Sequence, residues 1–262
     1  MTAADCTIVR RLMFLTLPVA GLIALIGLSG QPASGRIATD EPLAAAARAL
    51  PRIAVAQAAA PVRPLRFTIV DSAGAAVRRW PGGPIVGTMA ATSPLGAHSW
   101  SWALSTTRNH RWVRIVLPWR PNGQTGWISL AGRRVTRTAI WVEADLSRRT
   151  VTLMKGRGSL VVFKSAIGAP STPTPTGRFS VTDLVATGDP SGPFGWYAFG
   201  LSGHQPDLPA GWSGGDQLAI HGTNNPSSIG TAASAGCLRV SAAALGTLRR
   251  FLRLGTPVVI HR

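Results

Sequence analysis

Short apolar or alternating stretches recur between residues 65 and 137, and each is followed by a turn sequence. These stretches cover residues 66–70, 85–89, 100–104, 112–117 and 127–130. The clusters between them, at 81–84, 93–96 and 121–123, are rich in Pro, Gly, Ser and Asn, which favour turns. Short strands at regular spacing with turn signals between them are typical of a barrel or sandwich, so residues 65–137 are predicted to form a small all-β module.

The same kind of pattern continues through residues 138–262, with one exception near the end. Strands are predicted at 139–142, 150–154, 160–167, 178–182, 217–221 and 257–260. The exception is 241–253, where Leu245, Leu248 and Leu252 share one helical face, Ser241 suits the N-cap and Gly255 follows the end. The second module is therefore predicted to be mostly β with one C-terminal helix.

The stretch from Ala186 to Asp216 stands apart because it has eight Gly, four Pro and little periodicity. A loop of this length inside a compact domain is unusual unless it has a function. It is therefore predicted to be a lid over a nearby site.

The N-terminal residues have the pattern of a targeting segment. Arg10 and Arg11 precede an apolar run from Leu12 to Leu28, which ends at small residues. This order predicts a signal peptide or an uncleaved membrane anchor over residues 1–30, and export of the rest to the cell envelope. Residues 31–64 are rich in Ala and Pro and are predicted to be a flexible tether.

Composition excludes some classes of protein. With 45% hydrophobic residues the chain is too apolar to be disordered, and two cysteines are too few for a disulfide scaffold or a Cys-based zinc site. The formal net charge is +17, and 25 of the 27 cationic residues are Arg. No metal or cofactor is predicted.

Residues 65–137 carry much of this charge, with ten Arg against one acid, Asp71, and six of the nine Trp. One interpretation is a groove for an anionic or glycan polymer of the cell wall. The alternative is that Trp112 and Trp127 fill a small core while Arg solvates the surface. Nucleic acid is not predicted as a partner, because the protein is predicted to be exported.

Candidate chemistry lies at His221 and Cys237. Cys6 lies in the targeting segment, so Cys237 is the one thiol of the predicted exported part and is either reactive or buried and inert. Gly236 precedes it, and a Gly-flanked turn can expose the sulfur and present backbone N–H groups to an oxyanion. His221 ends a predicted strand and is the nearest base in the sequence that could activate the thiol.

Both modules resemble known families. Residues 65–137 resemble bacterial SH3-like modules through 83–88 (GPIVGT), 111–115 (RWVRI) and 126–128 (GWI). Residues 138–262 closely resemble the L,D-transpeptidase (YkuD-like) catalytic domain through 174–179 (TPTGRF), 221–223 (HGT), 229–230 (IG) and 234–239 (S-x-G-C-L-R). The expected architecture is a small SH3-like barrel followed by a β-sandwich-like catalytic domain with one helix.

The second resemblance implies roles for individual residues. Cys237 is the expected nucleophile and His221 the base, with the Gly222 carbonyl orienting the imidazole. The N–H groups around Gly236 and Cys237 are the expected oxyanion hole, and Ser234 is expected to hydrogen-bond within the loop. One departure is Ala235, where many members of the family have His.

A further set of residues is expected to contact substrate or line its cleft: Arg239, Trp196, Tyr197, His204, Thr223 and Asn224. For Arg239 the alternative is a structural role in bracing the cysteine loop.

The resemblance implies attack by Cys237 on a peptidoglycan tetrapeptide stem, release of D-Ala, and transfer of the acyl group to an amine of a second stem. It also implies acylation of Cys237 by carbapenems. Three alternatives stay open: an L,D-carboxypeptidase that uses water, a non-catalytic wall-binding protein, and a cysteine peptidase of other specificity.

Overall fold

The computed structural model describes residues 65–262. The predicted signal peptide or anchor (1–30) and the predicted tether (31–64) lie outside the described residues and stay predictions. No helix between residues 65 and 262 is both long and apolar enough to cross a membrane.

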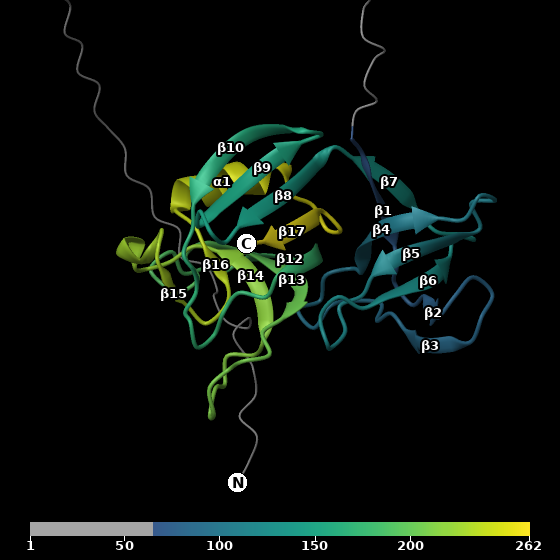
Figure 1. The fold of residues 1–262 in the computed structure, drawn as a ribbon, viewed down its shortest axis with the longest axis horizontal. Helices are drawn as coiled ribbons and strands as arrows, with labels where there is room; N and C mark the ends of the chain where they lie inside the picture. Colours follow the sequence, from purple (N-terminus) through teal and green to yellow (C-terminus); the bar gives the residue numbers. More distant parts are fainter. Residues whose placement is uncertain (1–64) are drawn as a thin grey trace, which may run out of the picture. The chain divides into compact units, whose positions relative to one another are not determined.

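The first module is one antiparallel sheet of seven strands in the order β3-β2-β6-β5-β4-β1-β7 (Figure 1). Its strands are β1 (Phe67–Asp71), β2 (Ala76–Arg78), β3 (Ile85–Thr88), β4 (Trp100–Thr106), β5 (Trp112–Val116), β6 (Thr125–Ser129) and β7 (Val135–Thr138). All five predicted strands are present. Strands β2 and β7 were not predicted, because they are short and carry few apolar residues. The likeness to SH3-like modules stays a prediction.

The core of this module is made mainly of aliphatic side chains. Val70, Val113, Ile115 and Ile128 are fully buried in it. Trp112 and Trp127 are only half-buried, so the prediction that they fill the core is wrong. Alternation along β5 and β6 places them on the opposite face from Val113 and Ile128.

The second module is built on a mixed sheet of eight strands in the order β10-β9-β8-β17-β12-β13-β14-β16 (Figure 1). Its strands are β8 (Ile140–Asp145), β9 (Thr150–Lys155), β10 (Gly158–Lys164), β12 (Gly177–Ala186), β13 (Tyr197–His204), β14 (Gln217–His221), β16 (Leu238–Arg239) and β17 (Pro257–His261). A small parallel pair joins β11 (Ile167–Gly168) to β15 (Ala232–Ser234), and η1 (Pro226–Ser228) is a 3-10 turn.

Strand β12 links the two halves of this sheet. Its first residues, Gly177–Ser180, pair with β17, whereas Val181–Ala186 pair with β13, and a register shift separates Val181 from Asp183. A strand that passes from one half-sheet to the other brings their inner faces together. The module is mostly β with one helix, as predicted.

The helix α1 (Ala242–Phe251) covers the inner face of the sheet. Ser241 caps it by accepting a hydrogen bond of 3.2 Å from the Ala244 N–H. Leu245 and Leu248 are fully buried in one cluster with Phe199 of β13. The predicted N-cap and leucine face are therefore confirmed.

The prediction that residues 186–216 form one long lid is wrong, because β13 lies in the middle of that stretch and of the sheet. Its glycines hide the alternation that marks a strand. A Cβ at Gly203 would lie 2.5 Å from the ring of Phe179, and one at Gly200 would lie 2.8 Å from the Asp183 carboxylate. Large neighbours on the adjacent strand thus require small residues here, and the loops reduce to 187–196 and 205–216.

Candidate active site

His221 and Cys237 lie on the same face of two adjacent strands. Strand β14 pairs in parallel with β16, with Ile220 opposite Leu238 and His221 opposite Arg239. Cys237 directly precedes β16. Ile220 and Leu238 point into the core, and side chains alternate along strands, so His221 and Cys237 share the other face. The structure therefore brings together the two residues that the sequence singled out.

The His221 imidazole is buried and held in one orientation. Its Nδ1 lies 2.6 Å from the Gly222 carbonyl oxygen, so Nδ1–H donates and Nε2 carries the free lone pair. The Phe194 ring packs edge-on against it, with ring centroids 5.0 Å apart. Burial lowers the pKa of His221 to about 4, and the charge of Arg239 lowers it too, against the opposing hydrogen bond to Gly222. The imidazole is therefore neutral at pH 7.

The Cys237 thiol is half-buried and directed at the Gln217 carbonyl oxygen, 3.9 Å from Sγ. Burial raises the pKa of Cys237, although a backbone hydrogen bond from Ala219 and the charge of Arg239 act in the opposite direction. No hydrogen bond among the described residues joins the thiol to the imidazole. The free protein thus holds a neutral thiol on the same face as a neutral base.

The loop before Cys237 is fixed by hydroxyl groups. The Ser234 hydroxyl accepts from the Gly236 N–H at 3.1 Å and donates to the Cys237 carbonyl at 2.6 Å. The Thr174 hydroxyl, from the TPTGRF motif, donates to the Gly236 carbonyl at 2.8 Å. Ser234 is therefore a loop hydrogen-bonding residue, as expected. The Gly236 N–H is thus bound to Ser234 in the free protein, and the oxyanion role expected for the N–H groups around Gly236 and Cys237 stays a prediction.

Gln205 also supports this loop, although it was not among the predicted site residues. Its side chain is buried, and its amide nitrogen lies 3.1 Å from the Thr172 carbonyl, 2.9 Å from Pro173 and 3.2 Å from Ala235. The amide fills the space beside Gly236, whose φ of +116° is unfavourable for other residues. In the sequence, Gln205 is one polar residue within the predicted lid. Its burial, which marks it as a support of the loop, is visible only in the structure.

Arg239 is placed opposite His221 in the β14–β16 pair and is half-buried. Its Nε is buried and has no hydrogen-bond partner within residues 65–262. Its charge lowers the pKa of both His221 and Cys237. Arg239 is therefore a cation whose charge favours the thiolate form of Cys237.

Three expected substrate contacts need correction. Tyr197 is buried in the core beside Phe199, and Trp196 packs against the same cluster, with Arg249 of α1 over both rings. Both lie on the helix side of the sheet and not on the face of His221. His204 is not in a free lid, since its two ring nitrogens face oxygen acceptors.

The remaining two candidates follow His221 in the loop after β14. The Thr223 hydroxyl accepts from the Asn225 N–H at 3.0 Å, which shapes the turn, and Asn224 is exposed. Their position beside the site is compatible with contact to a substrate.

Comparison with known proteins adds to this geometry. Residues 139–260 match the family model of the L,D-transpeptidase catalytic domain, YkuD. The putative L,D-transpeptidase YkuD of Bacillus subtilis (strain 168) is 33% identical over 121 residues, which cover 46% of this chain and 65% of the relative. The protein of the same name from Bacillus licheniformis is 34% identical over 119 residues, 45% of this chain and 64% of the relative. The matched part thus spans slightly less than two thirds of these relatives.

Solved structures of the same class align at lower identity. The L,D-transpeptidase from Mycobacterium smegmatis aligns with 63% of this chain and 92% of that chain, at 14% identity and a TM-score of 0.37. L,D-transpeptidase 3 from Mycobacterium tuberculosis, in complex with a faropenem-derived adduct, aligns with 55% and 76%, at 19% identity and a TM-score of 0.36. Residues 139–260 are thus similar to L,D-transpeptidase catalytic domains, both by the YkuD family model and by the curated relatives.

Proposed function

We propose that this protein is an L,D-transpeptidase that cross-links peptidoglycan stem peptides through a thioester on Cys237. The observation that carries the proposal is the placement of Cys237 and His221 on one face of adjacent parallel strands, with the imidazole oriented by Gly222. The predicted export would bring the enzyme to this substrate.

Acylation starts from the neutral pair. As Cys237 Sγ attacks the carbonyl carbon that precedes the terminal D-Ala, its proton passes to His221 Nε2 and the S–C bond forms. The imidazolium then gives this proton to the D-Ala nitrogen while the C–N bond breaks. Because both groups rest neutral, ionisation accompanies attack, and Arg239 stabilises the charge that develops on sulfur.

Deacylation reverses these proton movements. An amine from a second stem attacks the thioester, His221 accepts an amine proton, and the C–S bond breaks with return of a proton to sulfur. The product is a cross-link between the third residues of two stems. Attack by water at the same step would instead give an L,D-carboxypeptidase.

The oxyanion of both steps needs a donor beside the sulfur. Since the Gly236 N–H is bound to Ser234, the Cys237 N–H is the donor that we assign to this role. The Thr174 bond to the Gly236 carbonyl fixes the peptide plane that carries the Cys237 N–H, so the donor is held in place before the substrate binds.

The test is intact-protein mass spectrometry after exposure to a carbapenem, followed by analysis of muropeptides from a digest. One covalent adduct is expected on the native chain and none on Cys237→Ala. Cross-linked dimers with loss of D-Ala support a transpeptidase, and trimmed monomers alone indicate a carboxypeptidase. Retention of wall fragments with no adduct and no D-Ala release would refute an enzymatic role.

A further inference from the structure

The nucleophile loop is held by four residues at the two ends of the 205–216 loop, which we call the clamp: His204, Gln205, Asp216 and Gln217. The Gln205 N–H donates to the Asp216 carbonyl at 2.7 Å, so the two ends are joined. This bond closes the base of the loop next to β14, which carries His221.

The clamp contacts the Cys237 loop from two sides. The Gln205 amide reaches the Ala235 carbonyl, two residues before the nucleophile, at 3.2 Å. The Gln217 carbonyl faces Cys237 Sγ at 3.9 Å. Movement of either end would therefore displace the backbone or the sulfur of Cys237.

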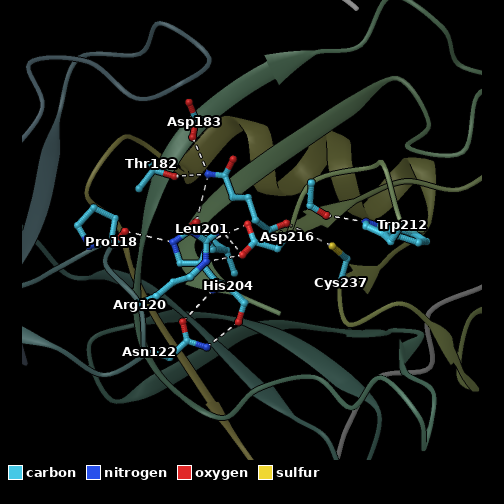
Figure 2. Close-up of polar contacts among 12 residues, drawn as sticks. Pro118, Arg120, Asn122, Thr182, Asp183, Leu201, His204, Trp212, Asp216 and Cys237 are labelled. Atoms are coloured by element: carbon cyan, nitrogen blue, oxygen red, sulfur yellow. Dashed lines mark hydrogen bonds and ion pairs between the residues drawn. The ribbon is translucent and has the colours of Figure 1, made fainter. Parts of the chain in front are cut away.

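The first module binds both ends of the clamp. Arg120 Nε donates to the Asp216 carboxylate at 2.6 Å, and its Nη2 donates to the same oxygen. The Asn122 side chain accepts from the His204 N–H at 2.8 Å and donates to the His204 carbonyl at 2.6 Å. Figure 2 shows the His204 ring between Asp216 and Pro118, whose carbonyl oxygen lies 3.1 Å from Nε2.

A second route from the first module runs through buried Asp183 on β12. The Ser93 hydroxyl donates to Asp183 Oδ1. The Gln217 amide nitrogen lies 2.9 Å from Asp183 Oδ2 and 2.9 Å from the Thr182 hydroxyl (Figure 2). Gly200 leaves the room for this contact, since a Cβ there would lie 2.9 Å from the Gln217 amide nitrogen.

We propose that the first module is a positioning element for the nucleophile, in which Arg120, Asn122 and Ser93 hold the clamp that holds Cys237. The expected effect of the first module on turnover rests on the function proposed above. Its effect on the thiol itself follows from the contacts alone. Figure 2 places Arg120 and Asn122 on the same side of the clamp, away from Cys237, so their action is indirect.

Loosening the clamp has two opposite consequences. The half-buried sulfur becomes more accessible, so a small alkylating reagent reacts faster. Turnover falls, because a nucleophile that is no longer held in one geometry loses the benefit of orientation, which amounts to roughly a hundredfold for a 1 Å displacement. A residue that served only global stability would change neither rate in the folded protein.

The experiment compares Arg120→Ala and Ser93→Ala with Arg108→Ala in the full chain. Arg108 is an exposed arginine of the same module, and none of its side-chain contacts joins it to the clamp, so it is the matched control. The measured quantities are the rate of Cys237 alkylation by iodoacetamide and kcat with tetrapeptide donor. Arg120→Ala and Ser93→Ala are expected to alkylate several-fold faster and to lose about tenfold or more in kcat, whereas Arg108→Ala matches the native chain.

A conservative variant separates positioning from folding. Arg120→Lys keeps the positive charge and one donor to Asp216, so it is expected to recover most of the native alkylation rate. An exposed ion pair contributes little to stability, about 0–1 kcal/mol, so all three arginine variants should unfold at similar urea concentrations.

The proposal is overturned if Arg120→Ala, Ser93→Ala and Arg108→Ala alkylate at the native rate. Alkylation needs no transpeptidase activity, which separates the two hypotheses. Faster alkylation in a protein that forms no cross-links would retain the positioning role and reject the proposed function.

Discussion

The hydroxyl of Ser234 lies 2.6 Å from the carbonyl oxygen of Cys237 and donates a hydrogen bond to it, while it accepts one from the Gly236 N–H. One buried side chain thus holds the peptide group that enters Gly236 and the peptide group that follows the proposed nucleophile.

Replacing Ser234 with Ala is expected to destabilise the fold and slow acylation. The Gly236 N–H and the Cys237 carbonyl would both lose a partner, and an unsatisfied buried group costs about 1–3 kcal/mol. Urea unfolding measures the loss of stability, and the rate of carbapenem adduct formation measures acylation. Ser227→Ala is the control, since within residues 65–262 this exposed hydroxyl bonds only the Asn225 side chain. Equal stability of the two variants would contradict the role given to Ser234.

The depressed pKa of His221 makes folding stability depend on pH. The folded value is about 4 against an ordinary 6.5, so the unfolded chain binds more protons between these values. Stability from this group is complete above pH 6.5 and is lost as the pH falls towards 4, a change of the order of 3 kcal/mol. Denaturant unfolding of the native chain and of His221→Asn from pH 4 to 7 measures it.

The comparison with His221→Asn is needed because His261 acts in the opposite direction. Its pKa is raised by hydrogen bonds to the Arg262 carbonyl and to Glu143, so its stabilisation is present at low pH and is lost as the pH rises. This contribution cancels in the difference between the two chains. A difference that stays constant from pH 4 to 7 would contradict burial of a neutral His221.

Removing the charge of Arg239 is expected to make the thiol harder to ionise. Arg239 lowers the pKa of Cys237, so in Arg239→Met the pH midpoint of iodoacetamide alkylation should move upwards. Arg239→Lys retains a positive charge and should keep the midpoint close to the native one. If Arg239→Met and Arg239→Lys shift the pH midpoint of alkylation equally, Arg239 acts through packing rather than through its charge.

Gly236→Ala is expected to be more damaging than Gly230→Ala. Both glycines have positive φ, +116° and +89°, which costs other residues about 1–3 kcal/mol. Space around Gly230 is open, whereas a Cβ at Gly236 would clash with the Gln205 amide and push it away from the Ala235 carbonyl. The two variants are compared by thermal unfolding and by the rate of Cys237 alkylation. Equal effects of the two substitutions would contradict the role of Gln205 in holding the Cys237 loop.

The amino-acid sequence by itself determined the local elements and singled out the proposed reacting pair, Cys237 and His221. Strand β14 begins and ends at the predicted residues, Gln217 and His221, and the helix has its predicted cap at Ser241. These features follow from side-chain periodicity and capping over a few residues, so they need no knowledge of the rest of the chain. The Cys237 and His221 motifs are also local, and their spacing indicated the family.

Only the tertiary structure decided what surrounds the pair. Strand β13 escaped prediction because Phe179 and Asp183 of a neighbouring strand occupy the space where Gly203 and Gly200 have no side chain. The contact of Arg120 with Asp216 joins residues 96 positions apart, and the neutral state of His221 arises from burial. Such properties depend on which distant side chains fill a given space and exclude water from it, and no short stretch of sequence records that.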